Sequence, residues 1–158
     1  MSYVIWRIPS GIALLLLCTG SIALCETNST EAPCAGEAEC SQFINQFVEE
    51  KLDLWQTRLK LQNWKISVLM TRRDQLKRKT LGGIRWDKAQ GSAVISVLDP
   101  SEYRLPFGEM LEDMEFTIVH ELVHLELASL PRSEASRSQE EHAVNQLTEA
   151  LLGLDRGN

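Results

Sequence analysis

A chain of 158 residues has room for one domain, and its 44% hydrophobic and 24% charged residues are ordinary for a globular protein. This composition excludes disorder over most of the length. The formal net charge of −6 argues against a nucleic-acid partner, because phosphate binding requires a basic surface. We therefore expect one folded domain, monomeric, with a substrate or partner other than nucleic acid.

The first 25 residues have the order of features of a secretory signal peptide. Arg7 and the amino terminus give a positive start, Ile12–Leu17 is an unbroken apolar run, and small residues follow. One interpretation is cleavage before Glu26. The other keeps residues 1–25 as an N-terminal anchor, through the apolar run itself or a lipidated Cys25. Both predict an exported protein, secreted or periplasmic, that touches a membrane only through this segment.

Residues 26–40 predict a tether ahead of the domain, because they are rich in Glu, Ala, Thr and Ser. Cys34 and Cys40 lie near its end, and an oxidising compartment favours a disulfide between them. Two free thiols are the alternative. Zinc ligation by this pair is disfavoured, since no second pair of Cys or His accompanies it. We assign residues 41–158 to the folded domain.

The first predicted elements are a helix and a strand. Residues 41–61 have helical spacing of their apolar side chains, and Ser41 can cap the start. Apolar and polar residues alternate over residues 64–70, which predicts a half-buried strand. The basic run that follows, residues 72–79, is interpreted as a solvated loop or short helix.

Two further strands are expected in the middle of the chain. Gly82-Gly83 predicts a turn, followed by a short strand at Ile84–Trp86. After a second turn, the β-branched segment Ala93–Leu98 predicts a strand that Asp99-Pro100 stops. We expect Trp64 and Trp86 to anchor the core.

Two helices complete the chain, from about Met110 to Leu130 and from about Arg137 to Leu152. Gly153 is expected to end the second one. The order of helix, three strands, helix and helix predicts an α+β domain. The apolar side of the last helix is predicted to consist of Ala143, Val144, Leu147, Ala150 and Leu151.

His120, Glu121 and His124 form an HExxH arrangement in a mostly apolar stretch. Residues four apart share one helix face, so both imidazoles can bind one ion, and zinc takes neutral imidazole nitrogens in tetrahedral surroundings. Glu121 is one step around the helix, which places its carboxylate beside the ion. There it can accept a proton from water whose pKa the cation has lowered. The pattern predicts Zn²⁺ as cofactor, His120 and His124 as ligands, and Glu121 as catalytic base.

This segment resembles the active-site helix of the zincin metallopeptidases, and the acidic helix after it is similar to that of the gluzincins, the group that includes thermolysin. In that group a glutamate on the following helix is the third zinc ligand. The resemblance covers residues 117–152 and implies this role for Glu141, with Asn145 hydrogen-bonding a ligand histidine. It implies a minimal zincin-like domain with an N-terminal helix, a small three-stranded sheet, an active-site helix and a C-terminal ligand helix.

The choice of Glu141 depends on where the last helix begins. Residues 138–141 spell a capping box, in which Glu141 would turn back to the helix start. Residues 136–139 spell another, which leaves Glu141 free inside the first helical turns. We favour the second. Under the first, Glu140 or His142 becomes the third ligand.

The resemblance also suggests how a substrate is held. Zincins usually bind the substrate backbone along an edge strand, and Ala93–Leu98 is the candidate. Oxyanion stabilisation beyond zinc itself would need a donor such as Tyr103 or Arg104. The expected function is zinc-dependent hydrolysis of peptide bonds in a peptide or protein substrate. The alternatives are another metal-dependent amide hydrolase, acting on cell-wall peptides, and a zinc-stabilised, inactive binding module.

Overall fold

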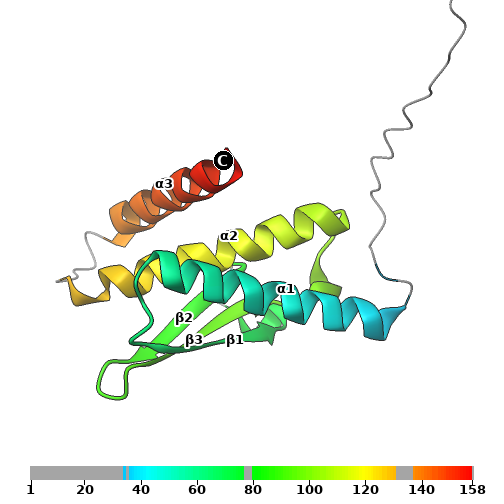
Figure 1. Cartoon of the computed structure of the whole chain (residues 1–158), viewed down its shortest axis with the longest axis horizontal. Coiled ribbons are helices and arrows are strands. Elements are labelled where there is room, and N and C mark those ends of the chain that lie inside the picture. Colours follow the sequence, from blue (N-terminus) through cyan, green and yellow to red (C-terminus); the bar gives the residue numbers. More distant parts are fainter. Residues whose placement is uncertain (1–33, 35, 77–79, 131–136, 158) are drawn as a thin grey trace, which may run out of the picture.

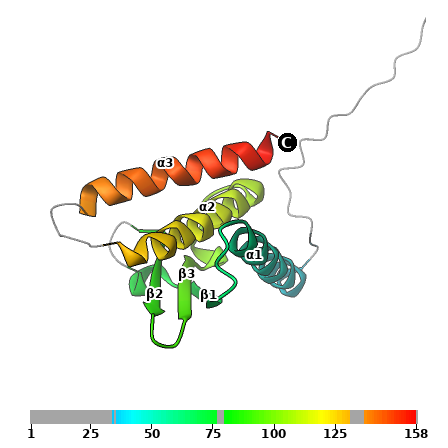
Figure 2. The same cartoon turned by 60° about the vertical axis from the view of Figure 1, so that its left-hand side comes forward.

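The computed structural model describes residues 34, 36–76, 80–130 and 137–157. They form the predicted α+β arrangement, in which helices α1 and α2 pack against a three-stranded sheet and α3 packs on α2 (Figures 1 and 2). The predicted signal segment and most of the tether lie outside these residues. Within the described ranges, no helix is long and apolar enough to span a bilayer.

Helix α1 (Glu37–Arg58) begins before Ser41, so the predicted start and the Ser41 cap are wrong. Gly36 occupies the N-cap position without a side-chain cap. Glu37 and Glu39 in the first turn compensate, because negative charge there interacts favourably with the helix dipole.

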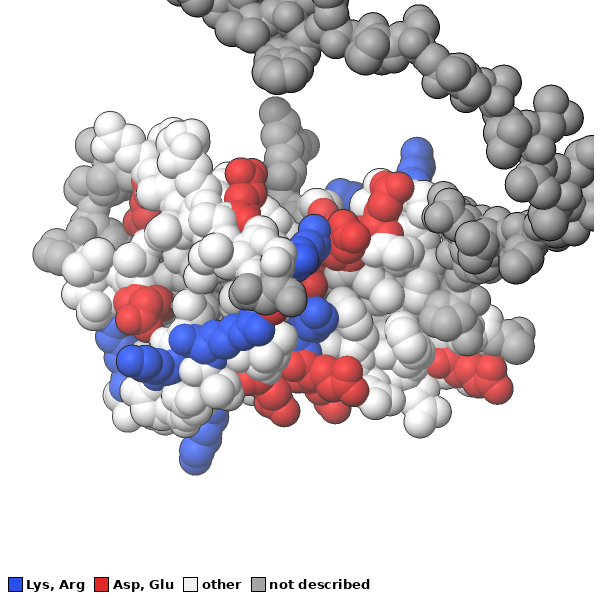
Figure 3. All heavy atoms as spheres, turned by 45° about the horizontal axis from the view of Figure 1, so that its top comes forward, with Lys and Arg blue, Asp and Glu red and all other residues white. Residues whose placement is uncertain are grey.

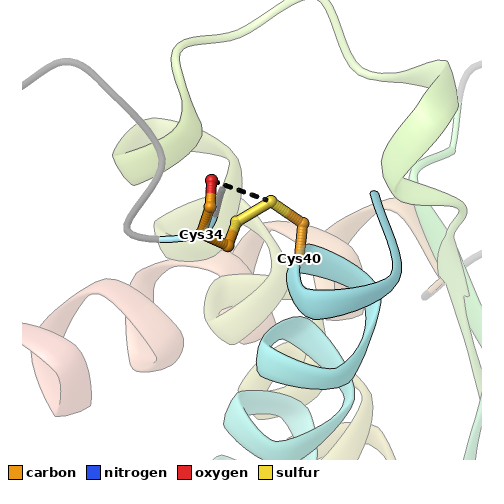
Figure 4. Close-up of a disulfide and its surroundings, with 2 residues drawn as sticks. All are labelled: Cys34 and Cys40. Carbon is orange, nitrogen blue, oxygen red and sulfur yellow. Dashed lines mark hydrogen bonds between the residues drawn. A yellow bond between two sulfur atoms is a disulfide. The ribbon is translucent and has the colours of Figure 1, made fainter. Parts of the chain in front are cut away.

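Cys34 and Cys40 form the predicted disulfide, which ties the chain entering α1 to the first turn of that helix (Figure 4). Their Cα atoms are 5.1 Å apart, an ordinary separation for a disulfide. The Cys40 Sγ atom also lies 3.8 Å from the Cys34 carbonyl oxygen. Since a bridged sulfur carries no proton, this approach is a contact and not a donated hydrogen bond.

The sheet has the strand order β1-β3-β2. Its strands are β1 (Lys65–Thr71), β2 (Gly82–Asp87) and β3 (Ser92–Leu98), close to the predicted segments. β1 is parallel to β3, and β2 is antiparallel to β3. Short 3₁₀ turns, η1 (Arg73–Gln75) and η2 (Pro100–Glu102), follow β1 and β3.

Strand β3 is central, so its prediction as the substrate-binding edge strand is wrong. Ile95 pairs with Val68 of β1 on one side and with Ile84 of β2 on the other, and it is fully buried. A strand with a neighbour on both sides has no free edge to offer a peptide. The edges of this sheet are β1 and β2. The sequence pattern gave the burial of β3 but carried no information about its neighbours.

Gly82 and Gly83 are the first two residues of β2, not the predicted turn. The turn between β2 and β3 comes at residues 88–91 as predicted, and Gly91 adopts a φ of 60° there, which favours glycine. Lys88 in this turn donates a hydrogen bond of 2.5 Å to the Ala128 carbonyl. The hairpin is thereby fastened to the end of the α2 segment.

Helix α2 (Phe107–Glu126) continues into a 3₁₀ turn, η3 (Leu127–Ser129), and α3 spans Arg137–Arg156. The predicted stop at Gly153 is wrong, because α3 passes through that residue. A glycine inside a helix costs only about 1 kcal/mol, which packing can offset. The predicted apolar side is partly wrong, since Leu147 is 48% exposed. The face that α3 buries consists of Val144, Thr148 and Leu152.

Among the described tryptophans, the most buried one was not singled out from the sequence. Trp55 of α1 is 1% exposed, whereas Trp64 and Trp86 are half-buried and pack against the core. The Trp55 indole N–H donates to Glu115 of α2 at 2.9 Å, and Lys51 forms an ion pair with the same carboxylate at 2.8 Å. The contact between α1 and α2 therefore contains a buried carboxylate with two partners.

Candidate metal centre

The structure brings His120, His124 and Glu141 together between α2 and α3. The Nε2 atoms of the two histidines are 3.1 Å apart. One Glu141 oxygen, Oε2, lies 3.5 Å from Nε2 of His120 and 3.4 Å from Nε2 of His124. In the described part of the chain, these are the side chains grouped closely enough to hold a metal ion together. The imidazoles come from one helix at a spacing of four residues, and the carboxylate is added by tertiary packing.

These three separations suit a tetrahedral ion. Zinc lies about 2.0–2.2 Å from its nitrogen and oxygen ligands, so two ligands of a tetrahedron are separated by about 3.3–3.5 Å. The observed 3.1, 3.4 and 3.5 Å are close to such edges. A hydrogen bond between the imidazoles would account for the first distance alone, because the two carboxylate distances are long for hydrogen bonds. The donor set therefore fits a small divalent cation.

The protonation of His120 also favours ligation. Burial, and then the neighbouring His124, lower its pKa, while Glu141 and Asn145 raise it by less. The neutral imidazole is the form that binds a metal. The expected hydrogen bond between Asn145 and one of these histidines is among the influences that raise the pKa of His120. Nδ1 of His120 is buried without a hydrogen-bond partner among the described residues.

Glu140 takes a different position from Glu141. Its Oε1 lies 3.2 Å from Nδ1 of His124, on the opposite side of the ring from the Nε2 atom that faces His120. Glu140 thus approaches the back of His124 and is not a member of the three-residue group. His142, the other alternative ligand, is exposed.

The start of α3 explains this placement. The helix begins at Arg137, which puts Glu141 inside its first turns, as the second of the two capping alternatives predicts. Ser136, the cap in that alternative, lies outside the described residues. Because Glu140 and Glu141 are consecutive, they diverge around the helix by about 100° and reach different nitrogens of the histidine pair.

Glu121 lies on the side of α2 that faces the edge strand β2. Its residue is 7% exposed. A Cβ atom on Gly82 would overlap Thr117 Cγ2, come within 2.8 Å of the Ser96 carbonyl oxygen, and lie 3.6 Å from Glu121 Oε1. The absence of a side chain at Gly82 therefore lets β2 approach the helix beside Glu121. Sequence reasoning missed this role, although a glycine in a strand often marks such a close approach.

Tyr103 and Arg104 are not brought to the three-residue group. The Tyr103 hydroxyl donates to Asp113 at 2.9 Å, and Asp113 precedes His120 by seven residues, about 10 Å along the helix axis. Burial and the adjacent Asp113 raise the pKa of Tyr103, so the phenol keeps its proton for this bond. Arg104 is exposed. The structure supplies no support for either residue as an oxyanion donor.

Comparison of the chain with protein-family models, with curated proteins and with solved structures gave no match in any of the three. The three grouped side chains are two imidazoles and one carboxylate, and Glu121 directly follows His120 on the same helix. In metal sites generally, three protein ligands and an open fourth position allow water or substrate to bind. Glu141 is 51% exposed, so the group is open to solvent on the α3 side.

Proposed function

We propose that this protein is a zinc-dependent peptidase. His120, His124 and Glu141 would hold the ion, and Glu121 would act as general base. The observation that carries the proposal is a trio of donor atoms 3.1–3.5 Å apart, two from the HExxH helix α2 and one from α3. The base residue directly follows the first histidine.

When bound, zinc supplies a Lewis acid that polarises a carbonyl and lowers the pKa of a water. The chain's own part is proton transfer by Glu121. Its carboxylate accepts one proton as the water oxygen bonds to the peptide carbonyl carbon. It then delivers that proton to the amide nitrogen as the carbon–nitrogen bond breaks. The net reaction consumes one water and yields a carboxyl and an amine terminus.

The substrate backbone is proposed to lie along β2. This strand is at the edge of the sheet, and its first residue, Gly82, is adjacent to Glu121. An extended peptide can add to an edge strand through backbone hydrogen bonds, which align it without reading its sequence. A peptide held there would run past the base residue.

We further propose that the peptidase acts after export. The Cys34–Cys40 disulfide supports this, because such bonds persist mainly in oxidising compartments. Cell fractionation combined with thiol labelling tests the idea. Recovery of the protein in the cytoplasm with both thiols free would contradict it.

The central test measures zinc content and cleavage of an unfolded protein substrate. The Glu121→Gln variant should retain one equivalent of zinc and lose about 10²–10⁴ in turnover, since the base is removed and the ligands remain. The His124→Ala variant should lose the zinc. Glu126→Gln, an exposed carboxylate at the end of the same helix, is the matched control and should behave as wild type.

Two results would overturn the proposal. Wild-type turnover in Glu121→Gln would remove this residue as base, and zinc retention in His124→Ala would remove the site. Stoichiometric zinc without chelator-sensitive cleavage would instead identify a zinc-stabilised binding module. Cleavage of cell-wall peptides but not of proteins would identify the other class of amide hydrolase.

A further inference from the structure

Glu140 makes a contact that metal ligation by its neighbour does not require. Its carboxylate lies 3.2 Å from Nδ1 of His124, and both side chains are largely buried, 19% and 10% exposed. The carboxylate comes from α3 and the imidazole from α2, so the contact crosses the helix interface. A buried carboxylate is costly without polar partners, and the His124 imidazole is one partner of Glu140.

The contact has a chemical consequence for the ring. A neutral imidazole carries its proton on one nitrogen and a lone pair on the other. A carboxylate can only accept, so Glu140 favours the tautomer with the proton on Nδ1. The lone pair is then on Nε2, the atom that lies 3.1 Å from His120 and 3.4 Å from Glu141. Glu140 thus selects both the tautomer and the orientation that the metal group needs.

We propose that Glu140 is a positioning residue that orients His124 for metal binding by accepting a hydrogen bond from its Nδ1–H. This inference rests on the proposed metal site. The consecutive glutamates of α3 then have different roles. Glu141 contributes an oxygen to the ion, and Glu140 accepts a hydrogen bond from Nδ1–H of His124. The corresponding atom of His120, Nδ1, is buried without a hydrogen-bond partner in the described structure.

The experiment measures zinc affinity by competition with a chromophoric chelator. Glu140→Ala should bind zinc about 10–100-fold more weakly, the usual effect of losing a partner behind a ligand histidine. Glu140→Gln should fall between Glu140→Ala and wild type, because its amide oxygen still accepts from Nδ1–H but carries no charge. Glu149→Ala removes an exposed carboxylate from the same helix and should leave the affinity unchanged.

A second variant and a second readout separate positioning from charge. Glu140→Asp keeps the negative charge near the start of α3 but withdraws it by one methylene, so it should also weaken binding. The visible absorption spectrum of the cobalt-substituted protein should shift in Glu140→Ala and Glu140→Asp, because the His124 ring is reoriented. Unfolding of the metal-free variants in urea checks that they fold.

The outcomes are distinguishable from failure of the proposed function. If wild type binds no zinc, or His124→Ala binds it equally well, the metal site itself is wrong. If wild type binds zinc through His124 but Glu140→Asp and Glu140→Gln bind it as tightly and with an unchanged cobalt spectrum, only the role of Glu140 is wrong.

Discussion

Helix α2 buries charged groups in its contacts with both α1 and α3, but the partners of these groups differ between the two contacts. Against α1, Glu115 has the Trp55 indole N–H and the Lys51 ammonium as partners within 3 Å. Against α3, the carboxylates of Glu140 and Glu141 lie within 3.5 Å of imidazole nitrogens. The α1–α2 contact thus pairs a carboxylate with an ammonium and an indole, whereas the α2–α3 contact pairs carboxylates with the imidazoles of the candidate metal site.

The two contacts of α2 also differ in the hydrogen bonding of their buried polar groups. In the α2–α3 interface, Thr148 Oγ1 and His120 Nδ1 are buried and without hydrogen-bond partners in the described part of the chain. Such groups lower stability. The space-filling view in Figure 3 shows acidic and basic side chains close to one another on one face of the molecule. Helix α2 therefore has an ion-paired, buried carboxylate in its contact with α1 and the candidate metal site in its contact with α3.

Of the changes considered, removal of zinc should have the largest effect on the free energy of unfolding. At free zinc about 1,000 times its dissociation constant, binding to the folded state alone adds about 4.1 kcal/mol to the free energy of unfolding. Urea unfolding with zinc and with a chelator measures it. The Glu115→Gln variant should show the same zinc increment as wild type, and His124→Ala should show almost none. An equal free energy of unfolding of wild type with and without zinc would contradict metal binding at the α2–α3 interface.

Glu115→Gln should come next, with a loss of about 2 kcal/mol. The amide oxygen can still accept from Trp55, but the ion pair with Lys51 is lost, and hydrogen bonds to charged groups contribute about 1.5–3 kcal/mol. Lys51 is 25% exposed, so water compensates part of its loss. Chemical unfolding of the metal-free protein measures the change, with the exposed Glu109→Gln as control. An unaltered midpoint would show that α1 does not anchor α2 through this carboxylate.

Gly82→Ala should destabilise by about 1–3 kcal/mol, because the added Cβ overlaps Thr117 and crowds the Ser96 carbonyl. It should also reduce turnover by moving β2 away from Glu121. Gly83→Ala is the matched control, since nothing lies within 4 Å of a Cβ at that position. Thermal unfolding and cleavage rates are compared. Similar behaviour of the two variants would mean that β2 does not depend on a close approach at Gly82.

The smallest effect is expected at Thr148. Thr148→Val replaces an unpartnered buried hydroxyl by a methyl of similar shape and should stabilise by about 1 kcal/mol. Thr71→Val is the opposite case, because its hydroxyl donates to the Leu69 carbonyl at 3.1 Å and its loss should destabilise. Urea midpoints compare the two. Destabilisation by Thr148→Val would show that the α2–α3 interface holds no unsatisfied hydroxyl there.

The local features of this protein followed from the sequence. Four-residue spacing on a helix places His120 and His124 on one face whatever surrounds them, and the structure shows their Nε2 atoms 3.1 Å apart. Alternating and β-branched segments predicted the three strands within a few residues, and two cysteines in a chain expected to be exported predicted the disulfide. Each depends on neighbours in the chain, whose geometry short-range sterics fix.

Tertiary packing alone decided the rest. No local feature of the sequence indicates that β3 becomes the central strand or that Gly82 contacts α2. The hydrogen bond between Trp55 and Glu115 is equally unmarked in the sequence. The rotation of α3 about its axis, which gives Glu141 to the histidine pair and Glu140 to the back of His124, depends on burying Val144 and Thr148 against α2. Burial sums contacts between residues far apart in sequence. The sequence could therefore pair the two histidines and favour Glu141 as the third group, but only the folded interface shows which histidine nitrogen each glutamate approaches.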